Sequence, residues 1–377
     1  MRILYSALRH DPTNPDLASG LDHSFYSAFI RGGAQVKIVG PFAERGTLPE
    51  RALKRAYVKL TGKRYLKWNV QLVIRSAREL SLACREWRPD LIFGLFPPPL
   101  AFYVGGSPCV LGIDTTFRGQ EALWPLYGRL PLRLLIWQER RAARKSALII
   151  AFSEWSKQDI MAQHGVGSER VLVQPMPSAL PEEVVPKHED FRARHMETPL
   201  HLLLVGREYE RKGIRVAVEA TRLLNARGMP AELTICGIPG RPDGPVRYAG
   251  PFKKSVPSEL GQYAGLYAAA DFLIHPAIFE AAGIVPAEAA AFGVPTITNA
   301  VGGLATSVAD GVSGVVLPPQ SPAEAYFEAV ARLVRNPSEY TRLSVGARRR
   351  YEEEQNWSVA GARVMKSLDE LVTLCRG

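Results

Sequence analysis

The sequence lacks the features that mark several specialised classes of protein. Its four cysteines are scattered along 377 residues without a CxxC pair, which argues against both a zinc site and a disulfide framework. No apolar run approaches the roughly 18 residues that cross a bilayer. The opening stretch ILYSAL meets charge from Arg9 to Asp11, too early for the apolar segment of a signal peptide, and is predicted to be a strand. These absences favour a protein of the reducing cytoplasm.

The residues that are present predict an α/β protein. With 46% hydrophobic and 22% charged residues, the chain is long enough for two globular domains of roughly 150 to 200 residues each. Short apolar runs alternate with helical patterns in both halves, which predicts parallel sheets joined by right-handed crossovers, hence doubly wound domains. The predicted strands are residues 2–7, 35–40, 90–96, 109–113, 147–152, 170–174, 200–206, 232–237, 246–250, 271–276, 295–299 and 314–318. The clearest predicted helix has apolar residues at helical spacing, at Leu66, Val70, Val73, Ala77, Leu80 and Cys84.

A proline-rich and charged stretch without strand signals separates the two halves. We therefore predict an N-terminal domain over 1–178, a linker over 179–199, a second domain over 200–355 and a C-terminal helix over 356–377. In open α/β sheets, ligands bind beyond the carboxyl ends of the strands, so two such domains facing each other form a binding cleft.

The formal charge of +10 is concentrated in the first half of the chain. Residues 1–199 hold 28 basic residues against 19 acidic ones, whereas residues 200–377 hold 19 against 18. Two runs, beginning at Arg51 and Arg129, combine basic residues with apolar residues at helical spacing, which is typical of a basic amphipathic helix. Each run is either the solvated outer face of a core helix or a contact for an anionic membrane or an anionic acceptor. Nucleic acid is not expected as a partner, because no recognition motif and no interleaved aromatic residues occur.

The segment GREYERKG carries two cations directly after a predicted strand. Gly206 and Arg207 follow the strand, and Lys212 and Gly213 open the next helix. Two cations beside a helix N-terminus suit a diphosphate, which requires positive charge and NH donors. A charged turn without a ligand is the simpler alternative.

The segment FEAAGIVPAEAAAFGVP sets two carboxylates, Glu280 and Glu288, among apolar residues, where a carboxylate is costly without a partner. Glu280 lies in the loop beyond a predicted strand, and Gly283, Ile284 and Val285 begin a helix whose unpaired NH groups suit the same phosphates. Glu288, one turn inside the helix, is placed to reach a ribose diol, and Glu280 faces the sugar. Alternatively, both are capping carboxylates near a positive helix end.

Together these motifs resemble the donor-binding domain of the family 4 (group 1) retaining glycosyltransferases of GT-B architecture. The resemblance covers residues 200 to 377 and includes the seven-residue spacing between Glu280 and Glu288. It is looser in the first half. The other residues that contribute to it are Gly293-Val294-Pro295, Val301-Gly302-Gly303-Leu304, Pro89-Asp90, Ser153 to Lys157 and Ser19-Gly20.

The resemblance implies two Rossmann-like domains facing a cleft, with the C-terminal helix crossing back to the first. It also implies sugar transfer from a nucleoside-diphosphate sugar with the anomeric configuration kept, without a cofactor or an obligatory metal. Arg207 and Lys212 would then bind the diphosphate and stabilise its leaving charge. The implied catalytic residues are Arg207, Lys212 and Glu280, and the implied substrate-binding residues are Gly20, Asp114, Gly206, Gly283, Ile284, Val285 and Glu288.

The sequence departs from the family pattern in three places. The family commonly has a histidine near the position of Asp114, so either Asp114 takes over an acceptor contact or the correspondence shifts by one residue. Ala281-Ala282 stand where an aromatic residue is usual, and GGLATS lacks the glutamate that often follows. These changes leave the sugar open. We expect His10, His23 and His275 to be structural.

The expected acceptor is a glycan, a lipid-linked acceptor or a small molecule. The expected location is cytoplasmic, with a peripheral contact on the inner face of an anionic membrane. A sugar-nucleotide 2-epimerase and a non-catalytic sugar-nucleotide-binding protein are the alternatives. A dinucleotide-dependent oxidoreductase is disfavoured, because CGIPGRPDG lacks the helix-opening GxGxxG.

Overall fold

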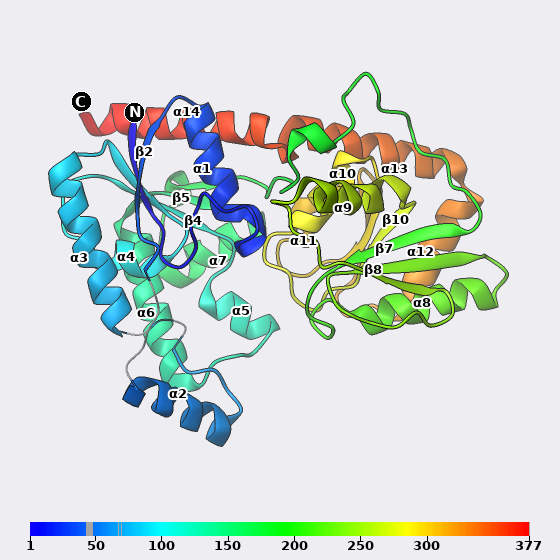
Figure 1. Ribbon diagram of the computed structural model, residues 1–377, viewed down its shortest axis with the longest axis horizontal. Coiled ribbons are helices and arrows are strands. Elements are labelled where there is room, and N and C mark those ends of the chain that lie inside the picture. The colour runs from blue at the N-terminus through cyan, green and yellow to red at the C-terminus, as the bar shows by residue number, and fades with distance from the viewer. Residues whose placement is uncertain (43–47, 67, 69, 377) are drawn as a thin grey trace. The chain divides into compact units, whose positions relative to one another are not determined.

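The computed structural model describes residues 1–42, 48–66, 68 and 70–376 of the chain. It separates into two compact units, one made of Met1–Gln174 with Gly361–Gly377 and the other of Pro175–Ala360. Each unit contains one six-stranded sheet whose paired strands are all parallel, with helices connecting them (Figure 1). The prediction of two doubly wound α/β domains is confirmed.

The sheet of the first unit has the strand order β2-β1-β3-β4-β5-β6. Its strands are β1 (Arg2–Ser6), β2 (Gln35–Val39), β3 (Leu91–Gly94), β4 (Cys109–Ile113), β5 (Ser146–Ala151) and β6 (Val171–Val173). Its helices are α1 (Leu21–Arg31), α2 (Leu48–Thr61), α3 (Val70–Trp87), α4 (Pro97–Phe102), α5 (Phe117–Leu123), α6 (Arg129–Lys145) and α7 (Glu154–His164). β3 and β4 are buried along their whole length, as expected of central strands of a parallel sheet.

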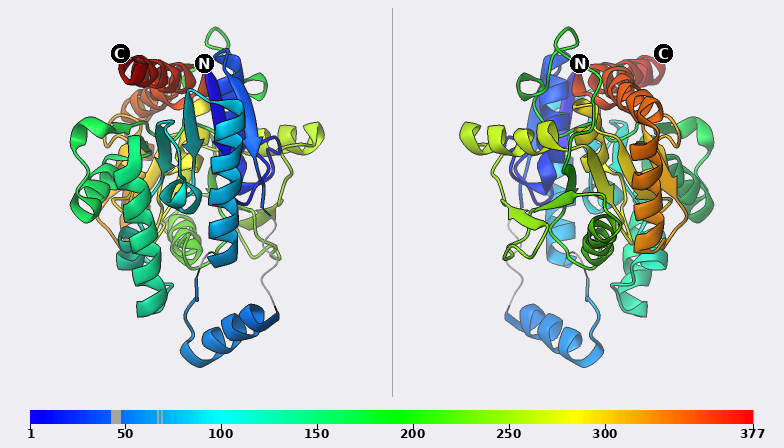
Figure 2. Two further views of the ribbon diagram at one scale, coloured as in Figure 1. Left: turned by 90° about the vertical axis from the view of Figure 1, so that its left-hand side faces the viewer. Right: turned by 90° about the vertical axis from the view of Figure 1, so that its right-hand side faces the viewer.

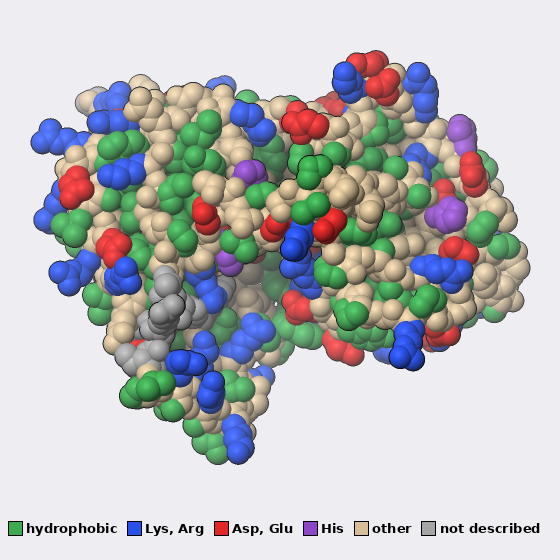
Figure 3. Space-filling view, viewed as in Figure 1, with side chains coloured by type: hydrophobic (Ala, Val, Ile, Leu, Met, Phe, Trp, Pro, Cys, Tyr) green, Lys and Arg blue, Asp and Glu red, His purple; other side chains and the backbone are tan. Residues whose placement is uncertain are grey.

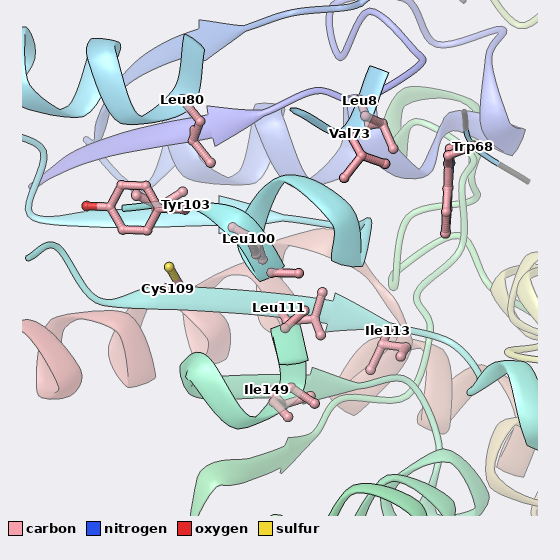
Figure 4. Close-up of a cluster of buried hydrophobic side chains, with 14 of the residues drawn as sticks. Leu8, Trp68, Val73, Leu80, Leu100, Tyr103, Cys109, Leu111, Ile113 and Ile149 are labelled. Carbon is pink, nitrogen blue, oxygen red and sulfur yellow. The ribbon is translucent and has the colours of Figure 1, made fainter. Parts of the chain in front are cut away.

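A large apolar core packs against one face of this sheet (Figure 4). It combines Val73 and Leu80 from α3, Leu100 from α4 and Leu111 from β4 with the indole of Trp68. Burying one such aliphatic side chain contributes about 1.5–3 kcal/mol. This core holds the helices in place behind the sheet, so the loops at the carboxyl ends of the strands start from fixed positions.

The predicted helical periodicity in the first unit is correct except at its start. α3 begins at Val70, and Leu66 precedes it, partly buried against the same core. Ala77 and Cys84 are buried as the pattern predicts. The pattern therefore identified the buried face of α3, although it placed the start of the helix about one turn too early.

The two basic runs form two different kinds of helix. α6 buries Leu135, Ala142 and Ala143 and is a core helix with a solvated outer face. In α2, by contrast, none of the 14 residues is buried. The core-helix alternative is therefore correct for α6 and wrong for α2.

The sheet of the second unit has the order β12-β11-β10-β7-β8-β9. Its strands are β7 (Leu200–Val205), β8 (Ala231–Cys236), β9 (Val246–Ala249), β10 (Phe272–His275), β11 (Thr296–Asn299) and β12 (Gly314–Leu317). Its helices are α8 (Ile214–Ala226), α9 (Pro257–Ala269), α10 (Ile284–Ala291), α11 (Leu304–Ser307), α12 (Ala323–Arg335) and α13 (Pro337–Arg350). All twelve strands predicted from apolar runs are present within about two residues of the predicted bounds.

The C-terminal helix α14 (Trp357–Arg376) begins in the second unit and returns to the first, as predicted. Gly361 lies so close to Ala28 of α1 that a Cβ at Gly361 would be 3.0 Å from the Ala28 Cβ, and Arg376 pairs with Asp90 at 2.5 Å. Residues 175–199, which include the stretch expected to be a linker, belong to the second unit. Among the described residues, no helix is long and apolar enough to span a membrane.

Candidate nucleotide-sugar site

Two loops of the second unit meet where the strand order reverses. β7 and β10 are neighbours, but the chain continues from β7 to β8 on one side and from β10 to β11 on the other. Such a switch point is where open α/β sheets bind ligands. The loops that leave it are residues 206–213 and 276–283, which hold half of the predicted site residues.

Close backbone contacts lock these two loops together. The Ile278 NH donates a hydrogen bond to the Arg211 carbonyl at 2.9 Å. Gly213 has φ +64°, and a Cβ there would lie only 1.9 Å from the Pro276 carbonyl oxygen. A side chain at position 213 would push the loops apart, so this glycine sets their separation.

The Glu280 carboxylate is held by two cations from the facing loop. Its Oε2 accepts a hydrogen bond from Lys212 Nζ in an ion pair and lies 3.4 Å from a guanidinium nitrogen of Arg211. The Glu280 side chain is 17% exposed, so this pair is largely shielded from water but not sealed. Gly206 makes room for it, because a Cβ there would lie 2.5 Å from Lys212 Cγ.

The surroundings of Glu280 keep it ionised. Burial alone would raise its pKa, but the charges of Lys212 and Arg211 and the interaction with His275 together hold the pKa well below its usual range. The cluster therefore carries fixed charges at neutral pH.

His275 ends β10 directly beneath this cluster. Its side chain is buried, and its Nε2 lies 3.5 Å from Glu280 Oε2, longer than an ordinary hydrogen bond. Neither ring nitrogen has a hydrogen-bond partner among the described residues. Burial, reinforced by the charge of Lys212, lowers the pKa of His275 to about 4, so the ring is neutral at pH 7.

Arg207 contrasts with Lys212, although both come from the same loop. It is exposed, and its guanidinium has no hydrogen bond or ion pair with any residue that the structure describes. It lies at the carboxyl end of β7, near Gly237 after β8. The loop thus offers two cations already paired with Glu280, namely Lys212 and Arg211, and one cation, Arg207, available to an anionic ligand.

Glu288 sits in a separate and more enclosed network. Its side chain is 1% exposed. One carboxylate oxygen accepts a hydrogen bond from Lys254 at 2.8 Å, and the other accepts from Tyr263 and Tyr267 at 2.6 Å each. Burial and the charge of Glu288 raise the pKa of both tyrosines well above the usual value, so both hydroxyls remain donors. The expected ribose contact is covered by these three side chains in this structure.

α10 begins at the same edge of the sheet. Gly283 precedes it with φ +77°, and its carbonyl accepts a hydrogen bond from Ser307 at 2.7 Å. The NH groups of Ile284 and Val285 lie in the first turn, where a helix has no internal acceptors for them. Replacing Gly283 would strain the backbone and bring a Cβ within 2.8 Å of the Ser307 Cβ.

The remaining predicted residues, Gly20 and Asp114, belong to the first unit. Gly20 precedes α1 with φ +84°, and Asp114 is exposed directly after β4. Both lie at the carboxyl edge of the first sheet.

Asp22 of α1, which the sequence did not single out, is buried. One of its carboxylate oxygens lies 3.0 Å from the Tyr5 hydroxyl, and the other has no hydrogen-bond partner among the described residues. Burial raises the pKa of Asp22 to about 6, although the hydrogen bond from Tyr5 acts to lower it.

Comparisons with known proteins extend the resemblance over both halves of the chain. A family model described as "Glycosyl transferases group 1" matches residues 187–350, and one described as "Glycosyltransferase Family 4" matches residues 23–177. The first range contains both loops of the switch point and α10. The chain belongs to family 4 (group 1) of the glycosyltransferases.

Individual relatives of this glycosyltransferase act on different molecules, according to their names. A D-inositol 3-phosphate glycosyltransferase of Frankia alni is 39% identical over 111 residues, which cover 29% of this chain and 27% of the relative. A glycogen synthase of Mycobacterium tuberculosis is 29% identical over 291 residues, covering 72% and 67%.

Sucrose-phosphate synthase from Thermosynechococcus elongatus has a similar structure, with a TM-score of 0.73, 16% identity and coverage of 99% of this chain and 100% of that chain. At this identity the likeness bears on the fold alone. It matches the two Rossmann-like domains of the GT-B architecture.

Sequence reasoning missed four side chains of this glycosyltransferase that contact the two glutamates of the predicted site. Arg211 was passed over because GREYERKG offers three cations and the pattern does not tell which one faces Glu280. Lys254 lies in a loop without a motif. Tyr263 and Tyr267 do carry a signal, since two tyrosines four residues apart share one helix face, but only the fold places Glu288 opposite them.

Proposed function

We propose that the protein transfers a sugar, with the anomeric configuration kept, from a nucleoside-diphosphate sugar to a glycan, a lipid-linked acceptor or a small molecule. The observation that supports this most is the cluster at the switch point, where Lys212 and an available Arg207 share one loop and Glu280 faces them from the other. Membership of the glycosyltransferase family supports the same reaction class.

The reaction requires an anion site that binds the diphosphate more strongly as the bond between sugar and diphosphate breaks. Cleavage of the bond to the diphosphate develops positive charge on the sugar ring and negative charge on the departing phosphate. In this proposal, Arg207 and Lys212 stabilise the phosphate, and the NH groups of Ile284 and Val285 approach it from α10. A lysine ammonium has three protons, so Lys212 can hold Glu280 and a phosphate oxygen together.

Glu280 is proposed to contact the hydroxyls of the donor sugar. Its 17% exposure leaves part of the carboxylate open, and Lys212 and Arg211 keep it ionised as a hydrogen-bond acceptor. The neutral ring of His275 has unused nitrogens beside it. Hydroxyl groups of a sugar are suitable partners for both residues.

Glu288 is proposed to bind the ribose diol after Lys254 moves away. The Glu288 carboxylate can accept about four hydrogen bonds, of which three are used here. The Lys254 side chain is partly exposed and flexible, so it is the partner that can leave without disturbing the core. The proposal predicts that a donor reorganises this lysine.

Retention and independence from metal are parts of the same proposal. In the same-face mechanism that the family resemblance implies, the leaving phosphate takes the proton of the acceptor hydroxyl, so no protein base is required. The cations of the site would neutralise the diphosphate in place of a divalent ion. We therefore propose that neither a cofactor nor a metal is needed.

The test is a thermal-shift panel of UDP-, GDP- and ADP-sugars, followed by transfer assays with the sugar that stabilises the protein. Proton NMR of the product identifies the anomer, and EDTA tests the metal. A product of unchanged anomeric configuration, formed equally in EDTA, is expected. An epimerised donor formed without acceptor would identify an epimerase instead, and binding without turnover would identify a binding protein.

The proposed membrane contact depends on another part of the molecule, the helix α2, whereas the proposed cytoplasmic location depends on the scattered cysteines. They do not follow from the donor site, because a diphosphate site serves water-soluble and lipid-linked acceptors alike.

A further inference from the structure

α2 is a helix whose described residues are all at least partly exposed. It lies apart from the sheet in all views of the first unit (Figures 1 and 2). None of its 14 residues is buried, whereas α6 of the same unit buries six. Helices of globular proteins owe most of their stability to packing of an apolar face, so the apolar residues of α2 call for a separate explanation.

Five apolar residues of α2 share one face, whereas Val58 lies on the other side of the helix. Leu48, Ala52, Ala56 and Leu60 follow each other at intervals of four residues, and Leu53 lies beside this row. All five are exposed, with Leu48 78% and Leu60 84% exposed. Single exposed leucines are ordinary, but a whole helix face of this kind marks an interaction site.

The opposite face of α2 is basic. The helix holds Arg51, Lys54, Arg55 and Lys59 against the single acidic residue Glu50. At 100° per residue, Arg55 borders the apolar face on the Leu48 side, and Lys59 lies at that edge between Leu48 and Ala52, whereas Lys54 and Arg51 lie on the opposite side. Long basic side chains at the borders of an apolar face can reach outward to lipid headgroups while their stems stay on the apolar surface.

The surface continues onto the start of α6. Tyr57 of α2 reaches Gly128, where a Cβ would lie 1.6 Å from the Tyr57 hydroxyl, and the Arg64 NH donates to the Leu126 carbonyl at 2.7 Å. Leu130 and Trp137 of α6 are 67% and 52% exposed. In Figure 3, the part of the surface at the bottom, over α2, shows hydrophobic and basic side chains side by side.

We propose that α2 and the first turns of α6 bind an anionic lipid bilayer, with α2 lying in the headgroup plane and its Leu48–Leu60 row facing the acyl chains. An amphipathic helix with low net hydrophobicity, basic borders and no folded partner is typical of interfacial helices. An acidic protein partner would need a groove that fits one face of the helix. An anionic bilayer can contact the basic side chains through its headgroups and the apolar row through its acyl chains at the same time. The excess of positive charge in the first half of the chain also favours binding to an anionic bilayer.

The first experiment is co-sedimentation of the full-length protein with two kinds of vesicle. One kind contains phosphatidylcholine alone, and the other also contains about 30% phosphatidylglycerol, whose negative surface charge attracts basic segments. Binding is expected only to the anionic vesicles and should fall as salt is raised, because the surface potential is screened. Equal binding to both vesicles, or binding to neither, overturns the proposal. An acidic partner protein would then be the remaining occupant.

A charge-reversal set tests the position of the surface. The variant Arg51→Glu, Lys54→Glu, Arg55→Glu and Lys59→Glu is expected to weaken binding to anionic vesicles by on the order of 100-fold or more. The matched control reverses four exposed basic residues elsewhere in the same unit, namely Arg31→Glu, Arg85→Glu, Arg363→Glu and Lys366→Glu. The control should lose much less binding, and equal losses would overturn the assignment to α2. Donor hydrolysis should be unchanged in both variants, so failure of this proposal is distinguishable from failure of the donor site.

A fluorescent label tests the orientation of the helix. Cys375 is the exposed cysteine, so Cys375→Ser provides a background in which Ala52→Cys on the apolar face, or Lys54→Cys on the basic face, carries an environment-sensitive dye. Anionic vesicles should shift the emission to shorter wavelength and increase its intensity for position 52 and leave position 54 nearly unchanged. The same response at both positions, or none at 52, contradicts an interfacial helix.

Discussion

Glu280 and Glu288 lie eight positions apart in one stretch of sequence, yet the structure treats them in opposite ways. Glu280 is held by Lys212 and Arg211 at a loop edge and remains 17% exposed. Glu288 is 1% exposed and held by one ammonium and two tyrosine hydroxyls. The first arrangement leaves charges beside a site that water and ligand can reach, and the second encloses a carboxylate within its own donors.

The difference sets a partly exposed charge cluster apart from an enclosed one. A cation that contacts the reacting diphosphate should matter most for turnover, whereas a cation or hydroxyl that only compensates a buried carboxylate should matter most for stability. Changes at the two carboxylates should therefore separate into these two effects, and the variants below test that separation in order of expected effect.

Lys212→Ala should have the largest effect, on turnover. Loss of a cation that stabilises the leaving phosphate should lower kcat by about 10²- to 10³-fold, roughly 3–4 kcal/mol in the barrier. Steady-state kinetics with the donor found in the panel measure it. Lys187→Ala, an exposed lysine of the same unit, should retain full activity. Wild-type turnover in Lys212→Ala would remove the cluster from the mechanism.

Glu288→Ala should have the largest effect on stability. It leaves the Lys254 ammonium and two buried tyrosine hydroxyls without their acceptor, which should lower the free energy of unfolding by about 3 kcal/mol. Urea denaturation measures it. Glu219→Ala on the exposed side of α8 is the control and should stay within about 0.5 kcal/mol of the parent. A stability equal to wild type would show that the network contributes nothing to folding.

His275→Gln should change how stability depends on pH. The folded pKa of His275 is about 4, against 6.5 for the free side chain, because burial disfavours the charged ring. Below pH 6.5 the unfolded chain gains a proton at this histidine that the folded protein does not. The free energy of unfolding of the wild-type protein should therefore fall by about 2 kcal/mol between pH 7.5 and pH 5 because of His275. Urea denaturation at both pH values should show a smaller loss for His275→Gln. The same loss in both proteins would contradict a buried neutral ring.

Tyr263→Phe and Tyr267→Phe should have the smallest effects. Each removes one of three hydrogen bonds to Glu288 and leaves Lys254 and the other tyrosine in place, so we expect a loss of about 1–2 kcal/mol in the free energy of unfolding. Tyr209→Phe, at an exposed tyrosine within the loop 206–213, should be nearly neutral in stability. Effects on kcat larger than tenfold from either buried tyrosine would mean that the Glu288 network belongs to the reacting centre.

The sequence predicted the strands well because each is a short apolar run, and central strands such as β3 and β4 are covered on both faces. It predicted the buried face of α3 for a similar reason. It left α2 and α6 undecided, since both have apolar residues at helical spacing. Only the absence of buried residues in α2 separates a surface helix from a core helix.

The sequence also predicted which two loops come together, because the alternation of strands and helices brings the carboxyl ends of the preceding strands to one edge. It did not predict the pairing within the site. Whether Lys212 pairs with Glu280 or stays available like Arg207 depends on the separation of two loops, which Gly213 sets through its approach to the Pro276 carbonyl.

What the sequence determined by itself is the α/β class, the order of the strands along the chain and the kinds of charge at the end of each. These are local properties, since periodicity and residue type are written along the chain. The tertiary structure alone decided that Glu288 faces Tyr263 and Tyr267, that Glu280 faces Lys212, and that none of the described residues of α2 is buried. Those are contacts, or missing contacts, between segments far apart in the sequence, and they exist only once the sheets have brought the segments together.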